Sequence, residues 1–172
     1  YKRQIVSGVA HDRSEAKVTV VGVPDIPGKA AEIFAVIAEA NANVDMIVQN
    51  VSREGTGRTD ISFTLPIVEG KEAREALRAA QERVCFEDIV YNEAIGKLSL
   101  IGAGMRSNPG ISATFFKALH EAGVNVDMIS TSEIRISVVT GEDKLDTAVK
   151  AIHSAFGMDT DVEATVYGGT GR

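Results

Sequence analysis

An eleven-residue phrase occurs twice in this 172-residue chain. The first copy is Glu39–Gln49 and the second is Glu121–Thr131, and both contain Asn-Val-Asp-Met-Ile. Each copy follows a Pro-Gly pair at the same distance, Pro27-Gly28 in the first and Pro109-Gly110 in the second. Repetition at a fixed spacing indicates a tandem duplication. The chain is therefore expected to fold as two related units.

The first copy predicts an alternation of strands and helices. An apolar, β-branched run over residues 17–22 predicts a buried strand that breaks at Gly22 and Pro24. A helix with one apolar stripe follows Pro27-Gly28 and stops near Asn41. Residues 43–51 and 60–65 predict two strands, the latter with one solvent-exposed face because Asp60, Ser62 and Thr64 alternate with apolar residues. A helix over about 73–84 and a strand at 88–91 complete the order βαββαβ.

The second copy repeats this order. Gly123 is the expected C-terminal cap of its first helix, and Asp143 is the expected N-cap of its closing helix. The predicted elements are a strand at 98–102, a helix at 111–122, strands at 125–131 and 134–139, the closing helix and a strand at 162–167.

Helices that are apolar on one stripe must lie on a sheet, which predicts an α+β fold. We expect two ferredoxin-like βαββαβ domains in tandem, each an antiparallel four-stranded sheet with its helices on one face. The expected boundaries are 15–92 and 95–172. Residues 1–14 form a strand-like arm that belongs to neither repeat, and we expect it to extend one of the sheets.

Composition excludes several classes of partner. The net charge of −6 provides no basic stripe for nucleic acid. No apolar run approaches the ~20 residues that span a bilayer, so no membrane partner is expected. Cys85 is the sole cysteine, which rules out an internal disulfide and predicts a cytoplasmic location.

Groups suited to catalysis are sparse. The histidines His11, His120 and His153 stand apart, and no cluster has the spacing of metal ligands. The fragment 102–107 resembles part of a dinucleotide fingerprint, but its sixth position is serine and Asn108-Pro109-Gly110 separates it from the helix. We therefore expect no catalysis, no metal and no cofactor.

The strand-to-helix loop, present twice, favours a small zwitterion instead. Free N–H groups at a helix start attract a carboxylate. The acidic residues nearby could meet an ammonium group. In the alternative interpretation, the asparagines only shape turns and the aspartates of the repeated phrase face solvent. The residues alone leave both interpretations open for Asn43, Asn125, Asp25, Asp45, Asp127 and Glu133.

Several phrases resemble one known family over nearly the whole chain. They include Gln49-Asn50-Val51-Ser52, the run 129–137 with Ser-Thr-Ser-Glu-Ile, and the terminal Gly169-Thr170-Gly171-Arg172. These phrases are similar to the paired ACT domains that regulate aspartate kinase, and most of all to its regulatory beta subunit.

The resemblance implies a regulatory chain without the kinase catalytic domain. It implies binding of threonine, lysine or both, and allosteric feedback inhibition of aspartate phosphorylation in lysine, threonine and methionine biosynthesis. The implied partners are a second copy, paired through the ACT domains, and a catalytic aspartate kinase alpha subunit. An alternative is an ACT-type module that binds another amino acid, or serves only oligomerisation, for another biosynthetic enzyme.

The resemblance also implies effector clefts between ACT units. We expect the Asp25 and Gln49 cleft to favour threonine, and a cleft that reaches Glu133 or Asp127 to accept a lysine ammonium. Ser132 and Glu133 match effector-contacting positions of related kinases. By position, one cleft uses Asp25, Gly28, Ala30 and Gln49 with Asn125 and Val126, and its counterpart uses Met105, Ile111 and Ser112 with Asn43, Val44 and Asp45.

Overall fold

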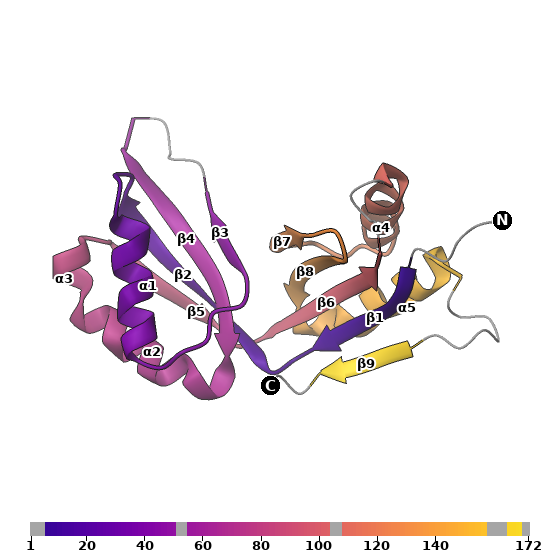
Figure 1. Cartoon of the computed structure of the whole chain (residues 1–172), viewed down its shortest axis with the longest axis horizontal. Helices are drawn as coiled ribbons and strands as arrows, with labels where there is room; N and C mark the ends of the chain where they lie inside the picture. Colours follow the sequence, from indigo (N-terminus) through magenta and orange to yellow (C-terminus); the bar gives the residue numbers. More distant parts are fainter. Residues whose placement is uncertain (1–5, 51–54, 104–107, 158–164, 170–172) are drawn as a thin grey trace. The chain divides into compact units, whose positions relative to one another are not determined.

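A computed structural model describes residues 6–50, 55–103, 108–157 and, as backbone, 165–169. The chain divides into two compact units (Figure 1). Residues 14–93 form one unit from a single stretch of sequence, which we call the contiguous unit. The other unit combines residues 1–13 with residues 94–172, and we call it the split unit.

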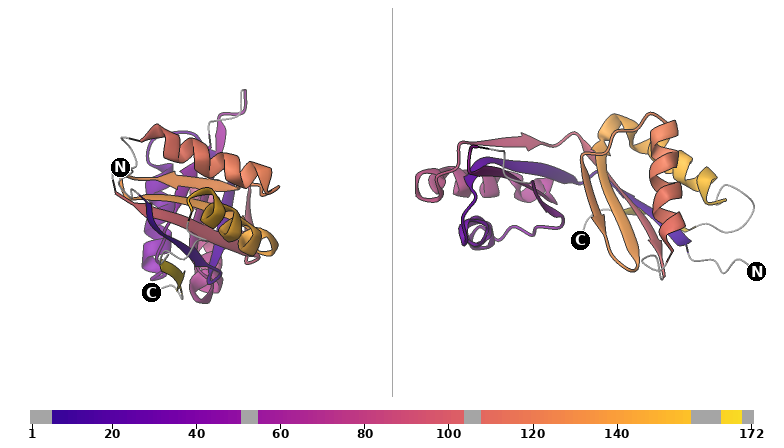
Figure 2. Two further views of the ribbon diagram at one scale, coloured as in Figure 1. Left: turned by 90° about the vertical axis from the view of Figure 1, so that its right-hand side faces the viewer. Right: turned by 90° about the horizontal axis from the view of Figure 1, so that it is seen from above.

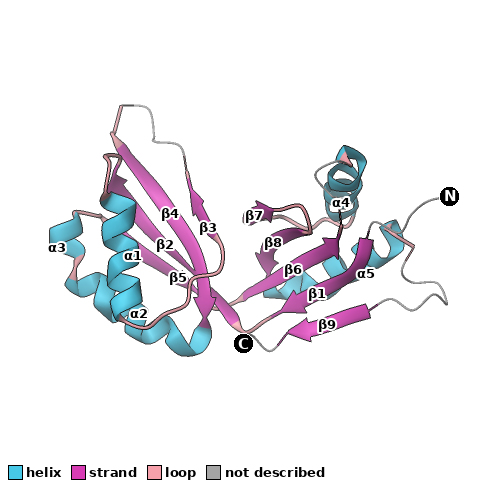
Figure 3. Cartoon of the chain, in the orientation of Figure 1, coloured by secondary structure: helices cyan, strands magenta, loops and turns pink. Residues whose placement is uncertain are grey.

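The contiguous unit is a four-stranded antiparallel sheet in the order β3-β4-β2-β5. Figure 3 shows its helices on one face of the sheet. This is the βαββαβ arrangement that the sequence predicts. The elements are β2 (Glu15–Pro24), α1 (Lys29–Glu39), β3 (Ile47–Gln49), β4 (Arg58–Pro66), α2 (Ile67–Ala79), α3 (Gln81–Val84) and β5 (Asp88–Asn92).

The apolar stripes of the helices form the core of this unit. Ile33 and Ile37 of α1 are fully buried beside Leu77 of α2, and Phe34 packs edge-on against Phe63 of β4 with ring centroids 5.7 Å apart. Burial of each such side chain contributes about 1.5–3 kcal/mol. Spacing alone therefore located the face of α1 that meets the sheet.

Several details of the contiguous unit differ from expectation. Among the described residues, the strand expected over 43–51 spans only Ile47–Gln49, and the helix expected over 73–84 is instead α2, which begins at Ile67 and ends at Ala79, followed by the short α3. Strand β2 does not break at Gly22 but continues to Pro24, because a β-bulge absorbs the glycine. The solvent-exposed face expected for β4 is wrong, since Ser62 and Thr64 are buried. Hydrogen bonds satisfy both hydroxyls: Ser62 pairs with Thr19 at 3.0 Å, and Thr64 accepts from the N–H of Met46 at 3.2 Å.

The split unit carries its helices on one side of a five-stranded sheet, as the view from above in Figure 2 shows. Phe115 and Leu119 of its first helix pack with Ile152 of its last helix in one core. The elements are β1 (Val6–Asp12), β6 (Ile95–Gly102), α4 (Pro109–Glu121), β7 (Met128–Thr131), β8 (Arg135–Gly141), α5 (Leu145–Ala155) and β9 (Thr165–Gly169).

Strand β1 corrects the expectation of a four-stranded antiparallel sheet in this unit. The order is β7-β8-β6-β1-β9, so β1 occupies the place beside β6 where the last strand of the repeat was expected. Strand β9 instead pairs in parallel with β1 at the edge. Residues 6–12 of the N-terminal arm thus form an interior strand of this sheet, and Val9 is fully buried.

The helix ends of the split unit confirm one expected cap and correct the other. Gly123 follows α4 with a φ of +71° and donates its N–H to the carbonyl of His120 at 3.0 Å, as a C-terminal glycine should. Asp143 is not the N-cap of α5, because a 3-10 turn over Glu142–Lys144 precedes that helix and Lys144 occupies the cap position. Within the described residues, no helix is long and apolar enough to cross a membrane.

Candidate functional site

A cavity of about 330 Å³ lies in the contiguous unit where the chain passes from β2 into α1. This volume falls at the lower end of small-molecule pockets, ~300–1,000 Å³. Its floor, formed by the buried Val23 and Ile61, is apolar, and its exposed rim combines the polar Asp25 and Gln49 with the apolar Ile26. The lining residues are Val23, Pro24, Asp25, Ile26, Pro27, Gly28, Lys29, Ala30, Gln49 and Ile61.

Backbone hydrogen bonds fix the shape of this loop. The N–H of Asp25 donates to the carbonyl of Gly57 at 2.8 Å, which ties the loop to the start of β4. Gly28 has a φ of +93°, a left-handed conformation that favours glycine, and it occupies the N-cap position of α1. The loop thereby turns sharply and presents the helix start to the cavity rim.

The start of α1 and its surroundings suit a ligand that carries both a carboxylate and an ammonium group. No side chain among the described residues caps this helix, so its first-turn N–H groups can attract a carboxylate. Lys29 lies at the rim but pairs with Glu32 at 3.2 Å within the same turn. Asp25 is exposed at the rim, where a carboxylate can meet an ammonium group.

The structure brings together four of the predicted effector residues around this cavity: Asp25, Gly28, Ala30 and Gln49. Gln49 comes from β3, which pairs with β4 at the edge of the sheet. Sequence reasoning missed the apolar part of the lining, notably Ile26 and Ile61. Ile26 is 57% exposed, and a large apolar residue in a Pro-Gly loop was the signal that could have identified it.

The Asn-Val-Asp segment of the contiguous unit is tied to its own fold. Asn43 donates its backbone N–H and its Nδ2 to the two carboxylate oxygens of Glu69, at 3.1 and 3.0 Å. Val44 is half-buried against the core, and Asp45 is exposed while its N–H donates to the carbonyl of Thr64 at 2.9 Å. The backbone of this segment is therefore held in a defined position.

The candidate residues of the split unit are spread over two regions. Ile111 and Ser112 are half-buried in the first turn of α4, and Met105 lies outside the described residues. In and just after the repeated phrase, Val126 packs against the core, whereas the remaining candidate side chains are exposed: Asn125, Asp127, Ser132 and Glu133.

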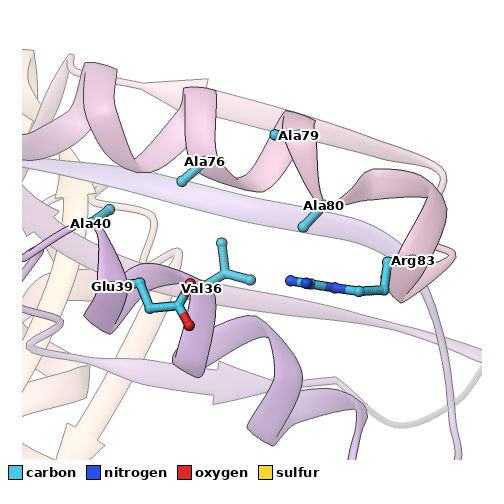
Figure 4. A pocket seen from close by; sticks show the side chains of 7 residues that line it. All are labelled: Val36, Glu39, Ala40, Ala76, Ala79, Ala80 and Arg83. Atoms are coloured by element: carbon cyan, nitrogen blue, oxygen red, sulfur yellow. The ribbon is translucent and has the colours of Figure 1, made fainter.

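Two other hollows on the contiguous unit are lined by none of the residues that the sequence predicts to bind an effector. One, of about 380 Å³, lies between α1 and the α2–α3 segment and is lined mainly by alanine (Figure 4). The carboxylate of Glu39 and the guanidinium of Arg83 approach Val36 from opposite sides there. The other, of about 540 Å³, is lined by residues of α2 and β5, including Arg74, which stacks 3.9 Å above the ring of Tyr91.

The described residues contain no group of three or more His, Cys, Asp or Glu side chains that could hold a metal ion. Cys85 is exposed, and its thiol contacts the carbonyl of Glu82 at 3.2 Å. The start of α1, Asp25 and Gln49 suit binding of a small polar molecule at the cavity rim.

Comparison with known proteins identifies the family. A family model described as ACT domain matches residues 18–81 and 98–156. Aspartokinase from Mycolicibacterium smegmatis is 58% identical over 98% of this chain, and aspartokinase from Corynebacterium glutamicum is 49% identical over the same share. The chain spans 40% of the length of these relatives.

Solved structures agree with the sequence comparison. The regulatory subunit of aspartate kinase from Thermus thermophilus superimposes with a TM-score of 0.82 at 38% identity, covering 87% of this chain and 98% of that one. A structure of aspartokinase alpha and beta subunits gives a TM-score of 0.82 at 41% identity, covering 88% and 99% of the two chains. The chain belongs to the ACT domain family, as a tandem pair of the kind found in aspartokinase regulatory subunits.

Proposed function

We propose that this chain is the regulatory part of an aspartate kinase and binds a free amino acid, threonine or lysine, to mediate feedback inhibition. The single observation that carries the proposal is the cavity at the β2–α1 loop. Its rim combines an uncapped helix start with the carboxylate of Asp25 and the amide of Gln49. These groups complement the carboxylate, the ammonium and a polar side chain of an amino acid.

Threonine is the effector that best suits this cavity. Beside the charged Asp25 and Lys29, the rim carries one uncharged polar side chain, Gln49, which is enough to pair with a single hydroxyl, and the floor at Val23 and Ile61 is apolar. A lysine side chain needs a carboxylate farther from its α-carbon. Asp127 and Glu133 of the split unit are exposed carboxylates suited to that role.

Regulation requires that the effector bind one assembly better than another. The free energy that couples effector binding to inhibition can be no larger than the difference between the two binding free energies, typically about 1–3 kcal/mol. We propose that a second copy completes each cleft with its Asn-Val-Asp segment, and that the paired chains act on a catalytic subunit. The chain then contributes no catalytic residue, and a ligand held by two chains favours the inhibited assembly.

Calorimetric titration of Gln49→Ala tests the assignment. We expect threonine to bind the unaltered chain and to bind Gln49→Ala at least tenfold more weakly, because the variant leaves the ligand hydroxyl unpaired. The matched control is Asn50→Ala, an exposed amide one residue along that does not line the cavity.

Equal threonine affinity for the unaltered chain and Gln49→Ala would overturn the threonine assignment. A chain that gives no heat with threonine or lysine, and no shift in melting temperature, would instead favour an ACT module for another amino acid or for oligomerisation alone.

A further inference from the structure

The cavity loop leaves its sheet at the β-bulge of β2. The register between β2 and β4 shifts between Val20 and Val23, so regular ladder pairing is interrupted at Val21 and Gly22. Gly22 has a φ of +69° at this point. Backbone groups in a bulge lose their ladder partners and need others.

Strand β4 supplies those partners from two side chains. Asp60 Oδ1 accepts the N–H of Gly22 at 3.0 Å, and Arg58 Nη1 donates to the carbonyl of Gly22 at 2.6 Å. Arg58 also pairs with Pro24 in the strand register. Its backbone and its side chain thus hold both ends of the segment that enters the cavity loop.

The same guanidinium reaches the turn between α3 and β5. Arg58 Nη1 donates to the carbonyl of Cys85 at 2.9 Å, and its Nε lies 3.6 Å from Glu87 Oε1. The N–H of Glu87 donates in turn to the carbonyl of Val21 at 2.8 Å. A β-carbon at Gly22 would lie 2.5 Å from Cγ of Glu87, so this side chain covers the bulge.

We infer that Arg58 is a positioning residue for the amino-acid cavity and joins the cavity loop to the α3–β5 turn. Arg58 does not line the cavity and acts through Gly22, Pro24 and Asp25. Without the guanidinium, the loop populates other conformations, and the apparent dissociation constant rises in proportion to the lost competent fraction. The inference rests on the proposed function, because it concerns the same cavity.

Because Arg58 joins the cavity loop to the α3–β5 turn, its contacts should have an effect that a purely stabilising contact would not have. When an amino acid orders the loop from Val23 to Ala30, the Arg58 contacts should also order Cys85 and Glu87. We therefore expect threonine to slow amide hydrogen exchange at Glu87, outside the cavity. Arg58→Gln should abolish this distant effect.

The experiment compares three variants of the full chain by calorimetry and hydrogen exchange. We expect Arg58→Gln to raise the threonine dissociation constant about tenfold, and Arg58→Lys, which keeps one donor, to raise it about threefold. The matched control is Arg78→Gln, which removes another exposed arginine of this unit that donates to a carboxylate, Asp88 Oδ1, at 2.9 Å. It should bind threonine within twofold of the unaltered chain.

Hydrogen exchange keeps the inference testable apart from the proposed function. If the unaltered chain binds no amino acid, the proposed function fails, yet Arg58→Gln should still speed exchange at Asp25 and Ile26 while Arg78→Gln does not. Unchanged exchange at those amides, or unchanged threonine affinity in Arg58→Gln, overturns the positioning role. Should Arg58→Gln fail to fold, Glu87→Gln replaces it, with an expected loss of affinity of about threefold, and an affinity within twofold of the unaltered chain overturns the inference.

Discussion

Strand β5 of the contiguous unit and strand β1 of the split unit occupy the same place in their sheets but come from different parts of the chain. Strand β5 ends its own repeat and pairs with β2, whereas β1 precedes both repeats and pairs with β6. The last strand of the second repeat, β9, lies one place farther out. A duplicated sequence can therefore build the same sheet with a different strand in one position.

The comparison also shows that the split unit depends on its N-terminal strand, β1. Because β1 has a strand on each side, it contributes hydrogen bonds to two ladders and the fully buried Val9 to the core. Arg13, just beyond β1, pairs with Asp146 of α5 at 2.8 Å. The stretch 14–93 is thus an insertion between two parts of one domain.

Removal of residues 1–12 is the change that would break this comparison most sharply. We expect the split unit to lose its folded structure, at a cost of about 5–15 kcal/mol, because an interior strand is missing. The contiguous unit should stay folded, since its strands all lie within 14–93. Hydrogen exchange measured by NMR would report each unit separately. Retained protection of β6 amides in the shortened chain would contradict the account, and Ser7→Ala, at an exposed position of β1, is the control.

Truncation of core side chains at equivalent positions of the two copies should give smaller losses in the free energy of unfolding. Each loss should be confined to the unit that carries the substitution. Phe115 and Ile33 are both fully buried in the first helix of their repeats. We expect Phe115→Ala to cost about 3–5 kcal/mol in the split unit and Ile33→Ala about 2–5 kcal/mol in the contiguous unit. Urea unfolding followed by unit-specific NMR signals measures both. Equal destabilisation of the two units by either variant would show that they do not fold independently.

A rise to alkaline pH should give the smallest loss of stability of the three changes, and it should destabilise the contiguous unit. Burial, together with the nearby Glu93 carboxylate, raises the pKa of Tyr91 from 10.0 to about 12. A raised pKa in the folded state contributes stability that is complete below pH 10 and is lost as the pH rises toward 12. We expect the melting temperature of this unit to fall across that window, and Tyr91→Phe to remove the dependence that this phenol causes. A pH profile identical in Tyr91→Phe would rule the phenol out as its cause.

The sequence predicted the helices of this fold well because their signal is local. The spacing of apolar residues three and four positions apart was enough to place Ile33 of α1 and Phe115 of α4 on the buried side of their helices. Ala38, expected on the same stripe, is exposed, and Val36 is buried in its place. Whether a residue at the border of an apolar stripe is buried depends on the angle at which the helix packs on the sheet. The spacing of apolar residues carries no information about that angle.

Strand order and strand faces were harder, because they depend on partners distant in the sequence. Nothing near Val9 indicates that it pairs with Leu100, and alternation in β4 could not show that Ser62 would be buried against Thr19. The same limit applies to the site. The sequence supplied the polar rim through Asp25 and Gln49, whereas the role that we propose for Arg58 depends on the bulge at Gly22.

The most direct measurement for the account is an NMR titration of the unaltered chain with threonine, followed residue by residue. If the cavity at the β2–α1 loop is an amino-acid site, saturable chemical-shift changes should centre on residues 23–30 and Gln49 and extend to Glu87. No shift at millimolar threonine and lysine, or shifts that leave the 23–30 loop unchanged, would contradict the central claim.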